Sequence, residues 1–185
     1  MFAAAALQSL ADDASARAAA ERAMRRALSS SASWTMERRL PGSSKTLVSS
    51  GVVDCRLGEA GIEWRTLVPF QSLVAMRGSS MVFEDEDGRR ERPAADMPRY
   101  ADIRKATDEF AAGKADAILE VFDVEAGSVP GGGWRVLLRP RLAAIRQLVE
   151  SVELSGAELP LVATLKSANG TVSRISFSSR EGNAK

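Results

Sequence analysis

The sequence predicts an α+β protein in which one large antiparallel sheet curls into an open or closed barrel and helices cover one mouth or face of it. Short alternating stretches, typical of strands, fill residues 33 to 85 and 133 to 178. A helical pattern occupies about residues 98 to 122 between them. Because the connections are too short for parallel crossovers, neighbouring strands are expected to run antiparallel. All 185 residues are expected to form one domain with a single core, since this length supports one.

The chain begins with a predicted helix over about residues 3 to 29, which are rich in Ala, Arg, Glu and Leu and contain neither Gly nor Pro. Its apolar stripe includes Ala14, Ala18 and Met24, so we expect this helix to pack on the sheet rather than to lie on a membrane surface. The apolar run before it lacks a basic region and is too short for a whole signal peptide. We therefore expect a signal peptide that is absent or truncated, with the run forming either its trimmed end or a first helical turn.

The first group of strands follows a Ser-rich break in the sequence. Strands are expected at residues 33 to 40, 45 to 57 and 61 to 67, and then in two short runs that meet near Gly78. Gly51 marks a bulge or bend in the second strand. The charged run at residues 84 to 96 is expected to form an exposed hairpin tip or loop.

The middle of the chain predicts two lid helices, of which the second is short and covers about residues 115 to 122. A loop or linker at residues 127 to 133 separates them from the second group of strands. That group begins at Trp134, continues through a helical turn into another strand, and ends in a hairpin. Asn169-Gly170 lies between two apolar runs there, which is a strong hairpin signal.

Composition argues against catalysis and against several classes of ligand. The chain has no His, which removes the usual general base and a common metal ligand. Cys55 has no Cys or His partner, and no Gly-x-Ser-x-Gly motif is present, so we expect no catalytic residue, no metal and no cofactor. A hydrolase or lipid-modifying enzyme remains the weakest alternative. With 25 basic and 24 acidic residues, the chain has no nucleic-acid footprint.

The inward positions of the predicted strands carry Trp, Met, Val, Ile and Leu, which either fill a core or line an apolar cavity. The candidate cavity residues are Trp34, Met36, Val48, Val52, Ile62, Trp64, Val74, Met76, Trp134, Val136 and Leu138. The candidate lid residues that would face the cargo are Phe110, Ile118, Leu119 and Phe122. For each residue, core packing and cavity lining both stay open at this point.

Two stretches resemble the outer-membrane lipoprotein carrier (LolA-like) family. In the first, a strand containing Ser-Ser-Gly leads into Gly61-Ile62-Glu63-Trp64 and then Pro69. In the second, Trp134 begins a strand that ends in Leu138-Arg139-Pro140, and a closing hairpin around an Asn-Gly turn follows. The order and spacing of these loose motifs agree over about residues 7 to 178. The turn at residues 58 to 60 lacks the basic latch residue of classical carriers, with Arg56 displaced from it, which places the chain closer to a divergent branch.

The resemblance implies a half-open barrel with a helical lid, a periplasmic location and an apolar cavity for acyl chains. The implied function is that of a carrier or chaperone that shuttles a lipoprotein or another lipid between membranes. Its implied partners are an inner-membrane donor and an outer-membrane acceptor, with no nucleic acid, no stable membrane insertion and a monomeric state. The alternative is a non-enzymatic periplasmic interaction module with a solid core, which docks on a membrane complex through its rim or an exposed strand edge.

Overall fold

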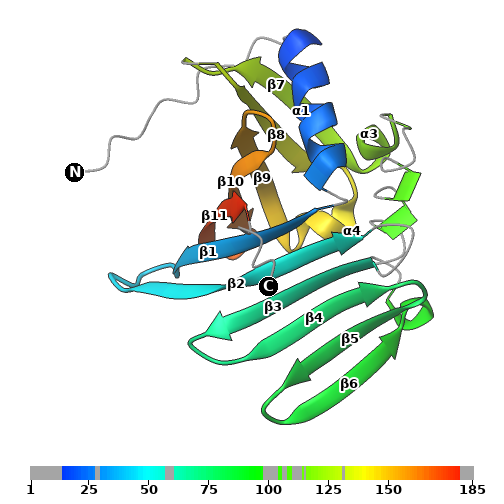
Figure 1. Ribbon diagram of the computed structural model, residues 1–185, viewed down its shortest axis with the longest axis vertical. Helices are drawn as coiled ribbons and strands as arrows, with labels where there is room; N and C mark the ends of the chain where they lie inside the picture. Colours follow the sequence, from blue (N-terminus) through cyan, green and yellow to red (C-terminus); the bar gives the residue numbers. More distant parts are fainter. Residues whose placement is uncertain are drawn as a thin grey trace, which may run out of the picture.

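The computed structural model describes residues 14–27, 30–56, 61–97, 104–105, 108–109, 114, 116–130 and 132–179. Within them, eleven strands form one antiparallel sheet in the order β6-β5-β4-β3-β2-β1-β11-β10-β9-β8-β7 (Figure 1). The sheet does not close, because β6 and β7 lie at its two ends and are not paired with each other. This curled, open sheet confirms the predicted fold class.

The elements follow the chain in a simple meander. The strands are β1 (Ser31–Arg39), β2 (Thr46–Arg56), β3 (Gly61–Val68), β4 (Ser72–Arg77), β5 (Ser80–Asp85), β6 (Gly88–Pro93), β7 (Phe122–Ser128), β8 (Trp134–Pro140), β9 (Val149–Gly156), β10 (Pro160–Ser167) and β11 (Val172–Ser179). The helices are α1 (Ala14–Ala27), η1 (Ala94–Asp96), α3 (Ala117–Val121) and α4 (Ala143–Arg146).

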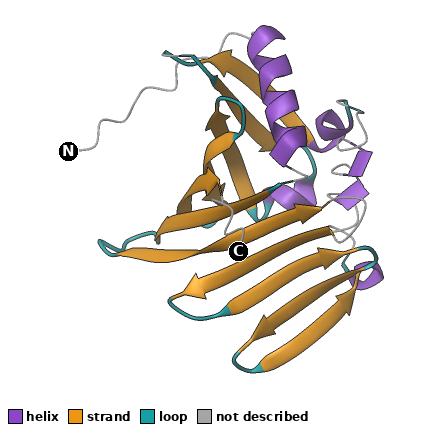
Figure 2. Cartoon of the chain, viewed as in Figure 1, coloured by secondary structure: helices purple, strands orange, loops and turns teal. Residues whose placement is uncertain are grey.

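Helix α1 covers only one half of the sheet. It packs across β7, β8, β9 and β10, while β3 to β6 extend away from it (Figure 2). Its buried residues, Ala16, Ala20 and Ala23, recur at helical spacing and meet a core that includes Trp134 and Val136. The prediction that this helix packs on the sheet is confirmed, and Met24 of the predicted stripe packs against this core. Ala14, however, is exposed and Ala18 only half-buried, because Ala16 and Ala20 face the sheet instead.

The face that carries α1 can be followed from strand to strand, because directly opposed residues in neighbouring strands share one face. We call it the α1 face. From β8 to β1 it passes through the pairs Val136–Leu154, Leu154–Ala163, Ala163–Ile175 and Ile175–Met36. From β2 to β5 it passes through Val53–Trp64, Trp64–Val74 and Val74–Phe83.

The opposite face is more polar and carries ion pairs between strands. Arg135 and Glu153 bridge β8 and β9 at 2.7 Å, and Arg139 pairs with Glu125 on β7. On the other half of the sheet, Glu63 pairs with both Arg65 and Arg77. A small apolar cluster of Leu73, Ala75 and Val82 lies in register beside these charged side chains.

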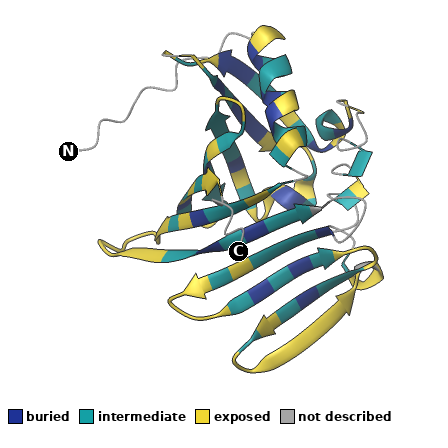
Figure 3. Cartoon of the chain, in the orientation of Figure 1, coloured by how far each residue is buried: buried dark blue, intermediate teal, exposed yellow. Residues whose placement is uncertain are grey.

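Three expectations for the chain path are corrected by the structure. The sequence Gly88–Pro93 is a strand rather than a loop, and all its residues are exposed (Figure 3). Its charged residues still pair in register with β5, because an edge strand can expose both of its faces. Residues 122–128, predicted as helix end and linker, form β7. The expected loop is therefore shorter and is the turn of the β7–β8 hairpin.

Other predicted elements agree with the structure. The helical turn before β9 is α4, and Asn169-Gly170 lies in the turn of the β10–β11 hairpin. The start of the predicted first helix and the turn at residues 58 to 60 lie outside the described residues. Of the first lid helix, Arg104, Lys105, Asp108 and Glu109 are helical, and Arg104 pairs with Asp108 at 2.8 Å.

Gly51 allows a close approach at the centre of the sheet. A Cβ atom on this residue would lie 1.9 Å from the carbonyl oxygen of Arg65 and 2.9 Å from the ring of Trp34. The Trp34 ring therefore occupies space that only a glycine leaves open. The register between β2 and β3 also shifts at this point, as the sequence predicted.

We predict that Gly51→Ala destabilises the protein strongly. Because the clash involves backbone as well as a buried ring, the loss in the free energy of unfolding should be about 2 kcal/mol or more. Urea denaturation followed by tryptophan fluorescence measures this change. Ser50→Ala, at the neighbouring position, is the matched control and should unfold near the wild-type midpoint. Equal midpoints for both variants would contradict the packing of Trp34 against Gly51.

Candidate ligand-binding site

Nine of the eleven residues predicted to point inward lie on the α1 face. Under α1, Trp134, Val136 and Leu138 are buried and belong to the core. On the uncovered half, Trp34 is buried, and the others are half-buried: Met36, Ile62, Trp64, Val74 and Met76. The same face of the sheet thus presents one continuous apolar surface, which is buried under α1 at one end and partly exposed at the other.

Val48 and Val52 do not belong to this surface. They lie on the opposite face, since Val52 is in register with Ser33 and Arg65, and Val48 is 57 % exposed. The α1 face of β2 is formed instead by Gly51 and Val53. The sequence does not show which residues of β2 point inward, because valines occur at both alternating sets of positions. Gly51, which occupies the inward position opposite Trp34, has no side chain that could indicate the face.

A cavity of about 100 Å³ lies between α1, α3 and the sheet. Its apolar lining consists of Met24, Ala20, Ile118, Leu119, Val124, Val136 and Leu138. Charged side chains of Arg17, Glu21 and Asp116 also line it. The cavity therefore brings together two predicted lid residues, Ile118 and Leu119, with two predicted cavity residues, Val136 and Leu138.

The remaining lid residues are placed differently. Phe110 lies outside the described residues. Phe122 begins β7 instead of belonging to a helix, and it packs against both the α1 core and the small cluster of Val121 and Ile145. Val124, which sequence reasoning missed, lines the cavity because it lies in the strand that was taken for a helix end and linker.

An aromatic cluster occupies the centre of the α1 face. The rings of Trp34 and Trp64 stack with their centroids 4.7 Å apart, and Phe177 meets Trp64 edge-on at 6.3 Å. Among the described residues, the indole N–H of Trp34 is buried without a hydrogen-bond acceptor. The corresponding N–H of Trp134, by contrast, donates to the carbonyl oxygen of Ala157 at 2.6 Å. A buried donor without an acceptor is unfavourable, so a site beside Trp34 suits a group that carries an acceptor.

The titratable groups around this face give no sign of acid–base chemistry. Burial, and to a lesser degree the nearby Asp54, raises the pKa of the Cys55 thiol from 9.0 to about 11. A hydrogen bond from Arg77, with a further one from Arg65, holds the pKa of Glu63 below its usual value, but Glu63 lies on the opposite face. In the described part of the chain, no three His, Cys, Asp or Glu side chains gather as metal ligands, and no helix is long and apolar enough to cross a membrane.

Comparison with known proteins finds likeness in structure only. No family model and no curated protein matches the sequence. A LolA superfamily protein from Nitrosomonas europaea is similar, with a TM-score of 0.46 and 11 % identity, over 91 % of this chain and 93 % of that one. A DUF1329 family protein from Desulfovibrio piger has a TM-score of 0.37 and 12 % identity, over 92 % and 94 %.

A chain from the MucA/MucB complex of Pseudomonas aeruginosa is also similar, with a TM-score of 0.42 and 16 % identity. The match includes 90 % of the present chain. The present chain spans only 56 % of the length of that matched chain.

We predict that Cys55 reacts slowly with Ellman's reagent in the folded protein. At pH 8 a thiol with a pKa of about 11 has about a hundredfold less thiolate than one with a pKa of 9.0. Since the thiolate is the reacting species, the folded rate should be lower by at least this factor than the rate in urea. Similar rates in the two states would show that Cys55 is neither desolvated nor inert.

Proposed function

We propose that the protein is a non-enzymatic carrier of an amphiphile, which binds an acyl chain against the α1 face and releases it without bond chemistry. The observation that carries this proposal is the apolar cavity between α1, α3 and the sheet, which is continuous in register with the half-buried apolar residues of β1 to β5. The described residues offer no constellation for catalysis at this face.

The cavity is too small for an acyl chain as it stands. Its volume is about 100 Å³, whereas small-molecule sites usually occupy about 300–1,000 Å³. Binding therefore requires α1 or α3 to move away from the sheet. This supports a lid that opens for the cargo and closes over the same apolar residues when the cargo leaves.

The packing of α1 is weak enough for such an opening. Its fully buried side chains are Ala16, Ala20 and Ala23, each of which buries one methyl group, so together they contribute about 2 kcal/mol. Arg17 adds a hydrogen bond to the carbonyl oxygen of Val124 at 3.2 Å, which contributes about 1 kcal/mol. An acyl chain that buries ten methylenes gains about 8 kcal/mol before the entropic costs of binding. Opening also exposes the sheet residues beneath α1, which include Trp134 and Val136, so the acyl chain has to replace the contacts that the helix makes with them.

The chemistry of the cargo near its head group can also be inferred. The buried N–H of Trp34 favours a cargo with an acceptor, such as the ester or amide carbonyl that joins an acyl chain to its head group. We place this carrier in the periplasm, as a monomer that receives its cargo from an inner-membrane donor and delivers it to an outer-membrane acceptor. The cargo is an acylated protein or another lipid.

We predict that Leu119→Glu weakens binding of dansyl-undecanoic acid at least about tenfold, because it places an unpaired carboxylate in the apolar lining of the cavity. Fluorescence titration of the folded variant measures the affinity. Leu148→Glu is the matched control, since Leu148 is 56 % exposed and does not line the cavity. This control should bind like the wild type.

The same titration can also contradict the proposal that the protein is a carrier. Failure of the wild type to bind the probe, together with native mass spectra of the purified protein that show no acylated molecule, would exclude a carrier. Equal affinity of Leu119→Glu and wild type would place binding elsewhere on the protein.

A further inference from the structure

Most of the exposed large apolar side chains in the described part of the chain lie at hairpin tips of the β1–β6 half of the sheet. The turns that join β1 to β2, β3 to β4 and β5 to β6 all lie at the same end of their strands, and Figure 1 shows them along one edge of the molecule. We call this edge the tip rim. Six of the eight large apolar side chains that are exposed in the described part of the chain lie in its first two tips: Leu40, Leu47, Val48, Leu67, Val68 and Phe70.

This clustering is unusual for a surface that only meets water. Single exposed apolar residues are common, but several of them gathered at two neighbouring tips favour an interaction surface. Val68 lies in register with Ser50, two residues after Val48 in β2, so the two valines belong to adjacent strands on one face. Phe70, in the turn that follows, is 74 % exposed, the highest value among these side chains.

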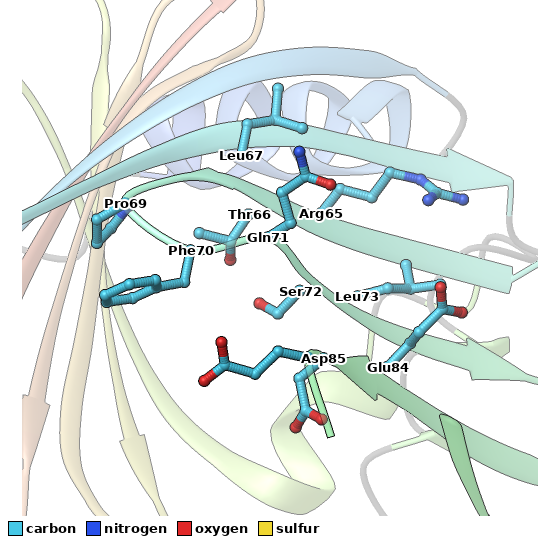
Figure 4. A pocket seen from close by; sticks show the side chains of 11 residues that line it. Arg65, Thr66, Leu67, Pro69, Phe70, Gln71, Ser72, Leu73, Glu84 and Asp85 are labelled. Atoms are coloured by element: carbon cyan, nitrogen blue, oxygen red, sulfur yellow. The ribbon is translucent and has the colours of Figure 1, made fainter. Parts of the chain in front are cut away.

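A cavity of about 460 Å³ adjoins Phe70. Leu67, Pro69 and Phe70 line it from the β3–β4 tip, and Glu84, Asp85 and Glu86 line it from the end of β5 and its turn. Figure 4 shows the Phe70 ring, from the β3–β4 turn, on one side of Ser72 and the Glu84 and Asp85 side chains, both from β5, on the other. The cavity thus offers an aromatic and aliphatic wall next to carboxylates.

The charges along the tip rim are divided between its ends. Asp85 pairs with Arg90, and Glu84 lies opposite Arg89 in register. Arg65 is the one basic residue among the described ones that line the cavity, against the three carboxylates, of which Glu84 and Glu86 are exposed. At the other end, Arg38, Arg39 and Lys45 adjoin the β1–β2 turn. The acidic end would be repelled by an anionic bilayer, but it suits a basic side chain.

We propose that the tip rim is a docking surface for a segment of a partner protein in which Lys or Arg side chains flank an apolar anchor. The anchor packs against Phe70 and Leu67, and the basic side chains meet Glu84 and Glu86. Aromatic side chains at the centre of such contacts carry much of the binding energy, and flanking charges set specificity and association rate. This site is distinct from the acyl-chain site and does not depend on it.

A peptide of sequence Gly-Lys-Lys-Leu-Phe-Leu-Lys-Gly, labelled with fluorescein, tests this inference by fluorescence anisotropy. Phe70→Ser should weaken its binding about tenfold or more, because the aromatic contact is lost. The double variant Glu84→Gln/Glu86→Gln should weaken it about threefold to tenfold at low salt and reduce its salt dependence. A twin peptide with Glu in place of Lys should bind more weakly than the basic one.

Two matched control variants distinguish peptide binding at the tip rim from non-specific binding elsewhere on the protein. Leu161→Ser removes an apolar side chain that is 50 % exposed elsewhere on the sheet, and Glu158→Gln removes an exposed charge. Both should bind the peptide like the wild type. Phe70→Ser should keep its affinity for dansyl-undecanoic acid, so failure of the docking site can be told from failure of the carrier proposal.

Three outcomes would overturn the inference. One is the absence of peptide binding by the wild type at millimolar concentration. Another is binding that is equally lost in Leu161→Ser and Phe70→Ser. The third is co-sedimentation with vesicles of phosphatidylethanolamine and phosphatidylglycerol that depends on Phe70, which would make the tip rim a membrane contact instead.

Discussion

The structure depends on one constraint: a single face of an eleven-stranded sheet is apolar along nearly its whole length, and α1 covers less than half of it. Where α1 packs, Trp134, Val136 and Leu138 are buried as an ordinary core. Where it does not, Trp64, Val74 and Met76 remain half-buried. An apolar surface that continues past its cover is costly in water, and an amphiphile that lies along it would reduce this cost.

The backbone hydrogen bonds between strands make the sheet rigid, whereas α1 is held on it only by side-chain contacts and can therefore separate from it reversibly. Every described strand except the two at the edges pairs with a neighbour on both sides, so the sheet cannot easily adapt its shape. The helix, by contrast, meets the sheet mainly through small alanine side chains and Met24, with polar contacts from Arg17 to Val124 and from Arg26 to Glu158. Opening is therefore expected at the boundary between α1 and β7–β8, where side chains rather than backbone hydrogen bonds separate, and not within the sheet.

The sequence predicted the sheet well because alternation and turns are local signals. Tight turns between alternating runs fixed nine of the eleven strands and their antiparallel order, and Asn169-Gly170 identified the last hairpin. Prediction failed where local signals were weak. The composition of β6 resembles a loop, since its charged residues need no apolar face at an edge. β7 contains Ala126 and Gly127, which weaken its strand signal, although Phe122 and Val124 pack beside Ala126 under α1.

The site shows the same division at the level of single residues. Residues on strands of clear phase, such as Trp64 and Val136, were placed on the correct face, whereas Val48 and Val52 were not, because the phase of β2 depends on a glycine. Phe177 and Val124 carried no separate signal, since their roles arise only when distant strands meet.

The positions of the two proposed binding surfaces also follow from the geometry of the sheet. Ligand contacts on the α1 face lie mid-strand, where the backbone is paired, and the tip rim lies where strands end and side chains are free to reach a partner. A sheet that stays open can therefore bind cargo on its face and a partner at its tips without either surface having to be rebuilt for the other.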